Sequence, residues 1–269
     1  MKATGGRELQ AFRIVQGATL AALLWKVHGY VDVVRLYLEM PLRQTFFPDW
    51  LQSPRVLIAA YLTATVALAA ALAVGHRLVR CGASVIAWLA ISVICLHQGS
   101  YNDATFTTAW WATLWSVWVS SRLGTADEQL PRRAARLAQA ILSLMFLGGA
   151  VGKWTAEYWS GQVFYEIYFV DRDFWFFNRL RASASPEALR EWATWYSRAV
   201  IIIETLCGAT LWALRPRVAG GLAAMVCVSV ALFASFYLFS VMLSLIGLAV
   251  ACLWFTPNRG RGEAAANAA

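Results

Sequence analysis

Long apolar stretches separated by short polar segments dominate the pattern of this sequence. A helix needs roughly 20 apolar residues to cross a bilayer core about 30 Å thick. The pattern therefore predicts an all-α integral membrane protein, a bundle of about eight transmembrane helices in a single polytopic domain over residues 1–255. The predicted spans are 9–34, 56–75, 83–96, 104–120, 134–152, 193–214, 218–234 and 240–255.

The last two spans come from one uncharged run, residues 218–255. As a single helix rising 1.5 Å per residue, this run would be about 57 Å long, nearly twice the thickness of the bilayer core. We therefore expect two spans with a turn near residues 235–240. The small and polar residues 256–269 are expected to form a disordered tail.

Residues 153–192 form the longest segment between two predicted spans. The segment is too aromatic for a solvated loop and too charged for a span, as in its run QVFYEIYFVDRDFWFF. Irregular backbone at membrane depth is tolerated where it is buried in protein or lines a wet cavity. We expect a re-entrant or interfacial segment that packs against the outer side of the bundle.

Composition agrees with a membrane protein, because 59% of the residues are hydrophobic and only 14% are charged. Soluble domains average about 25% charged residues. The balance excludes a disordered chain, a coiled coil and an ordinary cytosolic enzyme. None of the five cysteines forms a C-x-x-C pair, which argues against a dithiol oxidoreductase.

The net charge of +8 reflects topology rather than nucleic-acid binding, because the basic residues lie between apolar spans. With an even number of spans, more than half of the 23 Lys and Arg residues fall on the side that holds both termini. Lys and Arg accumulate on the cytoplasmic side of membrane proteins. We therefore expect a bacterial inner-membrane protein with its N- and C-termini in the cytoplasm.

Two ionisable residues stand out because they lie in or at the end of apolar spans. Lys153 follows closely on Gly148, Gly149 and Gly152, which would let a ligand or another backbone approach. It either snorkels to the interface or, if partly desolvated, acts as a neutral base. Glu204 lies inside the sixth span as a structural partner or a proton-handling group. Arg13 is a candidate counter-charge for it, although it could equally face the inner headgroups.

The predicted outer turn between the third and fourth spans, HQGSYNDATF, contains several polar residues and no basic one. Its side chains form either a hydrogen-bonded turn or one wall of an outward-facing site. In the second case His97 could exchange protons near neutral pH, and Asn102 and Asp103 would orient a ligand. The three histidines of the chain are scattered, so we expect no metal site.

Four motifs resemble the HTTM family, the membrane domain shared by bacterial proteins and the vitamin K-dependent gamma-carboxylase. They are AFRIVQG, SYND, GGAVGKWTAEYWSG and IIIETL. The chain looks like a short member of the bacterial type. The resemblance implies that Lys153 is the base acting on a reduced vitamin K-like lipid, with Trp159 and Gly161 as the motif's tryptophan and glycine. Where the carboxylase has an Asn-His pair this chain has Asn102-Asp103, so His97 is the nearby histidine.

Two functions remain open at this point. The first is an enzyme that uses a quinol or similar lipid-soluble reductant at an outward-facing site, with Lys153 as base and His97 and Glu204 as its other catalytic residues. The alternative is a non-catalytic subunit that binds lipid, pigment or partner helices in a larger membrane complex. The partners implied are membrane lipid and such a complex, and not nucleic acid. A transporter is disfavoured because the chain shows no internal repeat.

Overall fold

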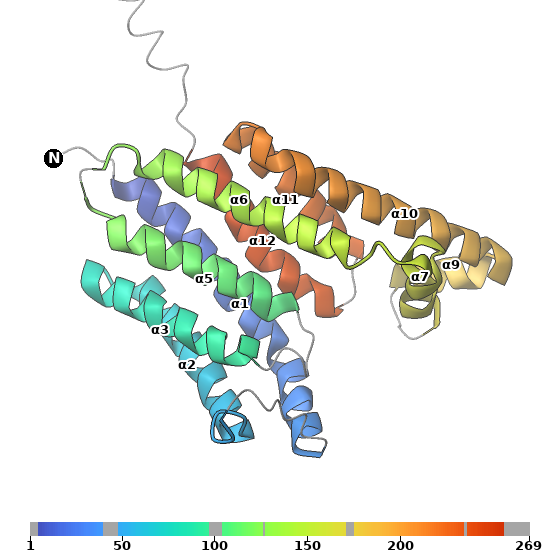
Figure 1. Ribbon diagram of the computed structural model, residues 1–269, viewed down its shortest axis with the longest axis horizontal. Helices are drawn as coiled ribbons and strands as arrows, with labels where there is room; N and C mark the ends of the chain where they lie inside the picture. Colours follow the sequence, from blue (N-terminus) through green and yellow to red (C-terminus); the bar gives the residue numbers. More distant parts are fainter. Residues whose placement is uncertain are drawn as a thin grey trace, which may run out of the picture.

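The computed structural model describes residues 5–39, 48–96, 104–125, 127–170, 175–233 and 236–255. Over these residues the protein is helical and contains no strand, so the all-α prediction is confirmed there. The long helices are α1 (Gly5–Glu39), α2 (Pro54–Ala73), α3 (Arg77–Leu96), α5 (Ala104–Arg122), α6 (Leu130–Val151), α10 (Pro186–Thr210), α11 (Pro216–Phe233) and α12 (Phe236–Trp254). Figure 1 shows them packed side by side as a bundle.

A group of short helices lies beyond the end of α6, at the right of Figure 1. We call it the lobe. It consists of α7 (Ala156–Trp159), α8 (Gln162–Tyr165), the π-helix η1 (Glu166–Val170) and α9 (Trp175–Ser183). A 3₁₀ turn, η2 (Leu211–Ala213), continues from the other end of α10.

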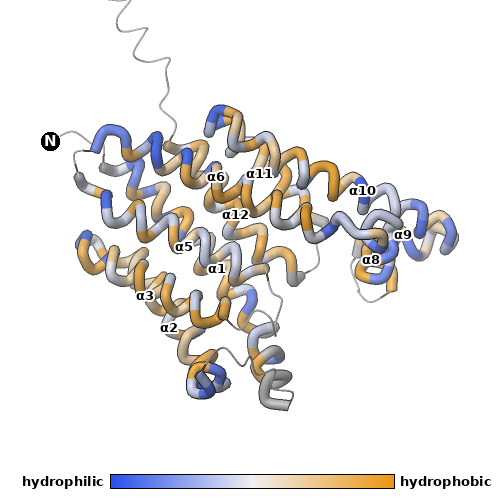
Figure 2. The backbone as a smooth tube through the Cα atoms, in the orientation of Figure 1, coloured by the Kyte–Doolittle hydropathy of each residue, from blue (hydrophilic) through white to orange (hydrophobic). Residues whose placement is uncertain are grey.

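Three of the described helices, α2, α3 and α6, are long and apolar enough to cross a membrane. Two shorter apolar stretches, Pro216–Leu232 and Leu238–Trp254, lie in α11 and α12. In Figure 2 the middles of the bundle helices are mostly hydrophobic, whereas hydrophilic residues gather at helix ends and in the lobe. The structure is thus that of a helical protein suited to a membrane by length and composition.

The helices extend beyond several of the predicted apolar ranges. Helix α10 begins at Pro186, well before residue 193, because the Ser185 side chain accepts a hydrogen bond from the Ala188 N–H and proline favours the first helical position. Helix α12 begins at Phe236, so most of the turn expected at 235–240 is helical. The predicted tail, residues 256–269, lies outside the described residues.

One end of the bundle is bound together by arginine side chains, and we call it the basic end. It contains the N-terminal ends of α1, α3 and α6 and the C-terminal ends of α5 and α12. The bonds run from Arg7 to the Trp254 carbonyl, from Arg77 to the Ser121 carbonyl and from Arg136 to the Leu214 carbonyl. Because cations favour the exposed carbonyls at helix C-termini, these contacts stabilise the helix ends that they join.

The core between α5 and α6 is built around Trp115, whose side chain is fully buried. Its indole Nε1 donates a hydrogen bond of 2.9 Å to the carbonyl oxygen of Ala134. Its ring also contacts Phe255 just beyond α12, at a centroid distance of 6.0 Å. A buried indole needs such a partner for its N–H, so this bond fixes how α5 faces α6 near the basic end.

The lobe is fastened to α10 through the backbone carbonyls at the end of α7. Three consecutive carbonyls accept hydrogen bonds from α10 side chains. The pairs are Ser197 with Tyr158 (2.6 Å), Arg198 with Trp159 (3.0 Å) and Thr194 with Ser160 (2.7 Å). They add side-chain donors to carbonyls at the end of a four-residue helix, and they make the lobe and α10 one packed unit.

Candidate functional site

Lys153 and Glu204 lie in direct contact, although 51 residues separate them in the sequence. The ammonium Nζ is 2.6 Å from Oε2 and 2.8 Å from Oε1, so it faces both carboxylate oxygens. The two side chains are 27% and 20% exposed. The pair is therefore sheltered from bulk solvent but can still be reached from one side.

A polar seam between α6 and α10 brings the two residues together. At the basic end Gln139 Nε2 donates to the carbonyl oxygens of Leu211 and Leu214. One turn along α6, Ser143 Oγ donates to the Gly208 carbonyl. Because the helices are antiparallel, moving up α6 from Ser143 means moving back along α10 from Gly208. Lys153 follows just beyond the end of α6, and its ammonium reaches back toward Gly149 to meet Glu204, one turn before Gly208 on α10.

The two helices touch backbone to backbone at Gly208. A Cβ atom placed there would lie 2.7 Å from the amide nitrogen and 2.8 Å from the Cα of Leu147. Only glycine allows this approach without moving one helix. Close contact at small residues is a common means of holding helices together in a membrane.

Replacing Gly208 with alanine is expected to push α10 away from α6. Overpacking of this kind costs about 1–3 kcal/mol, and the shift would also lengthen the Ser143 and Lys153 contacts. We expect a lower midpoint of unfolding in detergent titrations followed by tryptophan fluorescence. An unchanged midpoint would show that the helices separate there at no cost.

Gly149 leaves room next to the ion pair. A Cβ at this position would lie 3.4 Å from Glu204 Oε2 and 3.6 Å from Lys153 Nζ. The Lys153 ammonium also donates to the Gly149 carbonyl at 3.4 Å. The glycine thus keeps the space beside both charged groups free of side chains, as the sequence suggested for this run.

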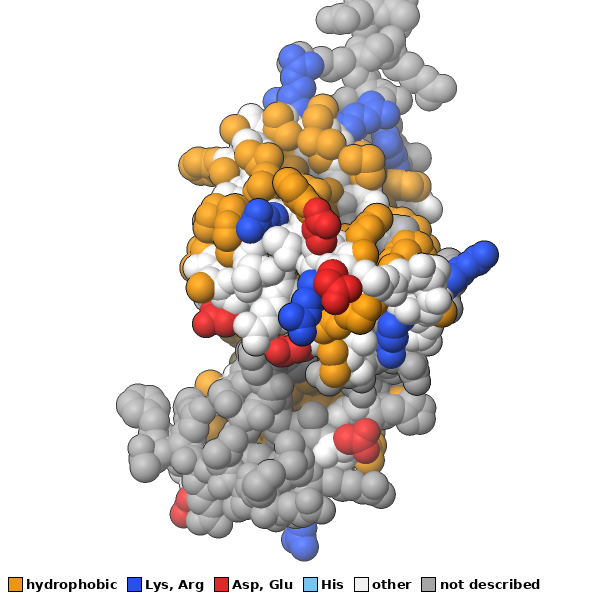
Figure 3. Space-filling view, turned by 90° about the vertical axis from the view of Figure 1, so that its right-hand side faces the viewer, with side chains coloured by type: hydrophobic (Ala, Val, Ile, Leu, Met, Phe, Trp, Pro, Cys, Tyr) orange, Lys and Arg blue, Asp and Glu red, His pale blue; other side chains and the backbone are white. Residues whose placement is uncertain are grey.

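Two tryptophans and an arginine form an aromatic shelf next to the pair. Trp154 donates from Nε1 to Thr205 Oγ1 at 3.1 Å and stacks on Trp159 with a centroid distance of 5.2 Å. The Arg198 guanidinium lies 5.5 Å over the Trp159 ring. Figure 3 views this side of the molecule and shows acidic and basic side chains among hydrophobic ones.

Gly161 is needed by the backbone rather than by a ligand in this structure. It has a φ of +80°, a conformation that favours glycine, and it begins α8. A Cβ there would lie 2.5 Å from both the nitrogen and the Cα of Thr194. The motif's glycine therefore lets the lobe backbone rest on α10, directly after Trp159 and Ser160.

Arg13 does not serve as the counter-charge of Glu204, because Lys153 takes that place. Its side chain is exposed on α1 and lies close to Arg80 on α3, at the basic end. The other interpretation, an arginine facing inner headgroups, stays a prediction. The remaining predicted site residues, His97, Asn102 and Asp103, lie outside the described residues, so their roles stay predictions.

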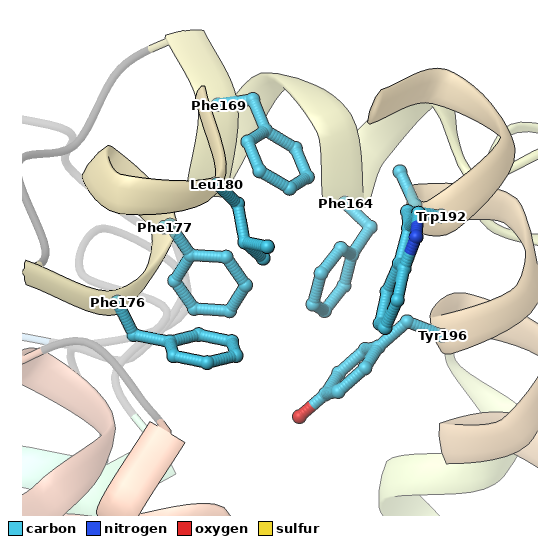
Figure 4. A pocket seen from close by; sticks show the side chains of 8 residues that line it. Phe164, Phe169, Phe176, Phe177, Leu180, Trp192 and Tyr196 are labelled. Atoms are coloured by element: carbon cyan, nitrogen blue, oxygen red, sulfur yellow. The ribbon is translucent and has the colours of Figure 1, made fainter. Parts of the chain in front are cut away.

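An apolar pocket lies between the lobe and α10, and the sequence did not reveal it, although the aromatic content of the lobe was evident. The pocket has a volume of about 130 Å³. In Figure 4 the ring of Tyr196 lies at the lower edge of the group of aromatic side chains that line it. Its lining is Phe164, Phe169, Phe176, Phe177, Leu180, Trp192, Ala193 and Tyr196. A cavity of roughly this size can hold a small apolar ring.

Two exposed carboxylates at helix starts in and beside the lobe have lowered pKa values. For Glu157 the pKa falls because the carboxylate accepts hydrogen bonds from its own backbone N–H and then from Thr155. The pKa of Glu187 falls for the same reason, with Ser185 as the side-chain donor. A depressed pKa means stability that is present above the ordinary carboxyl range and is lost as the pH falls.

An ammonium and a carboxylate in a sheltered site can exchange a proton with each other and with a bound hydroxyl. Such chemistry needs no metal, and among the described residues no three His, Cys, Asp or Glu side chains gather in a way that could hold one.

Comparisons with protein-family models, with curated proteins and with solved structures find no match for this chain.

Proposed function

We propose that the protein crosses the bacterial inner membrane eight times, with both termini in the cytoplasm, and acts on a quinol-type lipid-soluble molecule. The observation that carries the proposal is the contact of Lys153 with both oxygens of Glu204. Ionisable residues at membrane depth are costly and are generally retained for a function. The basic end, with its arginines, supports the cytoplasmic placement of the termini.

The pair serves as an acid–base couple in this proposal. As an ammonium, Lys153 cannot accept a proton, so the couple must first rearrange. The proton passes from Nζ to a Glu204 oxygen when a bound molecule displaces water, because a drier site favours two neutral groups over two charges. The free amine then accepts the proton of an acidic hydroxyl placed beside Gly149. The resemblance to HTTM proteins supports the same role for Lys153.

The decisive variant is Lys153→Arg, because arginine can keep the ion pair but is never deprotonated in proteins. We expect the purified protein in lipid nanodiscs to show quinol-dependent oxygen consumption. We expect Lys153→Arg and Lys153→Ala to lower it by about 100-fold or more, the usual contribution of a general base. Arg55→Gln, which changes an exposed arginine on α2, should leave it unchanged. Full turnover in Lys153→Arg would show that Lys153 is not the base.

The alternative function is a non-catalytic subunit of a membrane complex. It is favoured by the broad apolar surface of α10 and η2, where several large side chains face outward. They are Trp192, Trp195, Ile202, Ile203, Leu206 and Trp212. In that case the ion pair of Lys153 and Glu204 has a structural role and holds α6 against α10. Lys153→Arg would retain a co-purifying membrane partner, and the wild-type protein would show no quinol-dependent turnover.

A further inference from the structure

Three arginines converge at the basic end, far from Lys153, and we call them the arginine cluster. Arg80 lies on α3 and is only 6% exposed. Of the side chains that act on its charge, Arg13 and Arg77 repel it, and only Cys81, the weakest of the three, favours it. Among the described residues no carboxylate forms an ion pair with any of the three. The cluster is therefore an accumulation of like charge around a buried guanidinium.

The Arg80 side chain also lacks hydrogen-bond acceptors within the described part of the chain. Its Nε is buried and donates no hydrogen bond. Its guanidinium carbon lies 5.6 Å from the centroid of the Phe12 ring, which supplies an aromatic face but no oxygen. Gln16 Oε1, another buried atom without a partner, belongs to the polar layer that Gln16 and Ser84 form next to Arg80. A neutral amide oxygen can satisfy one donor but cannot balance the charge.

Among the described residues, the acids at this end form no ion pair with the cluster. One of them, Glu8 near the start of α1, has a buried carboxylate oxygen without a hydrogen-bond partner. The Asp127 carboxylate lies 3.8 Å from Arg122 and 3.9 Å from Arg133. Arg77 is held at the end of α5 by its bond to the Ser121 carbonyl, which places it beside Arg80 without neutralising either. A buried charge without a counter-ion is unfavourable, so an anion from outside would stabilise the cluster.

We propose that the arginine cluster binds the phosphate oxyanion of an anionic phospholipid headgroup. The planar guanidinium offers paired donors that match phosphate oxygens. Helix α3 is long and apolar enough to cross a membrane, so its first turns, with Arg77 and Arg80, are placed at headgroup depth. Arg13 and Arg77 are exposed and can reach the ligand from solvent, while Arg80 forms the floor. Basic pockets on the cytoplasmic side of membrane proteins bind lipid headgroups in this way.

The test is native mass spectrometry of the full chain in detergent with added phosphatidylglycerol, with phosphatidylcholine of the same acyl chains, and with inorganic phosphate. We expect phosphatidylglycerol to be retained, and Arg80→Gln and Arg13→Gln each to weaken its binding at least tenfold. Phosphatidylcholine should bind weakly to every variant. Displacement of the lipid by inorganic phosphate, lost in the same variants, would assign the site to a free phosphate ion instead.

The matched control is Arg190→Gln, which removes an exposed arginine from α10 near the lobe. It should retain phosphatidylglycerol as the wild type does. Because Arg80→Gln could unfold the protein, Arg13→Gln, at an exposed position, tests the site independently. Equal retention in wild type and Arg13→Gln, or an equal loss in Arg190→Gln, would overturn the proposal.

Discussion

Replacing Lys153 with methionine is expected to destabilise the protein by about 3 kcal/mol. The change keeps an apolar stem of similar length but leaves the Glu204 carboxylate, only 20% exposed, without its ammonium partner. Removing one member of a buried ion pair costs about 3–5 kcal/mol, and the partial exposure of this pair places the expected loss at the lower end. The midpoint of unfolding in a titration with a denaturing detergent measures it.

A second substitution separates the energy lost with the ion pair from the cost of leaving the Glu204 carboxylate without a counter-ion. In Lys153→Met combined with Glu204→Leu, both charges are replaced by apolar groups, which is often nearly neutral for stability. We therefore expect the double variant to recover most of the loss. If the double variant were as unstable as the sum of the two single variants, the two residues would not be coupled.

Gly161→Ala is expected to detach the lobe from α10. The new Cβ would overlap the Thr194 backbone, and the φ of +80° would be strained for alanine as well. Together we expect a loss of about 3 kcal/mol, composed of an overpacking cost and the backbone penalty. Hydrogen exchange of the α7 and α8 amides should accelerate, because the bonds from Thr194, Ser197 and Arg198 would no longer hold.

Gly148→Ala provides the control for a glycine-to-alanine change in the same region. Gly148 lies in α6, and a Cβ there would meet nothing within 4 Å. Alanine is the better helix former, so this variant should be as stable as the wild type or slightly more stable. Identical exchange profiles for the two variants would show that the contact with Thr194 does not hold the lobe.

The sequence revealed the ionisable residues of the site but not their partners. Lys153 and Glu204 attract attention because charges are rare in apolar runs. Their pairing depends on how α6 and α10 are rotated against each other, which the close approach at Gly208 and the bond from Ser143 determine. Nothing local to either residue encodes that rotation, so Arg13 was a candidate counter-charge for Glu204.

Helix existence was easier to predict than helix ends or burial. Apolar runs mark the part of a helix that packs or faces lipid, whereas caps such as Ser185 set where it begins. Arg80 is one of the Lys and Arg residues that an even number of spans places on the side of both termini. It lies on the buried face of α3 with Ala83, Ser84 and Ala87, and Phe12 on α1 packs against its guanidinium.

The attachment of the lobe to α10 has a mechanical consequence. From Gly208 to the start of α10 at Pro186 the helix spans about 33 Å, and the whole lobe is bonded to its outer half. Helix α10 could therefore tilt about its close contact with α6 at Gly208, and the contact of Glu204 with Lys153 restrains this tilt. If that contact were broken and α10 tilted by about 5°, its N-terminal end would move by about 3 Å, given this length of helix. Loss of the single contact between Lys153 and Glu204 would in this way be amplified into movement of the lobe.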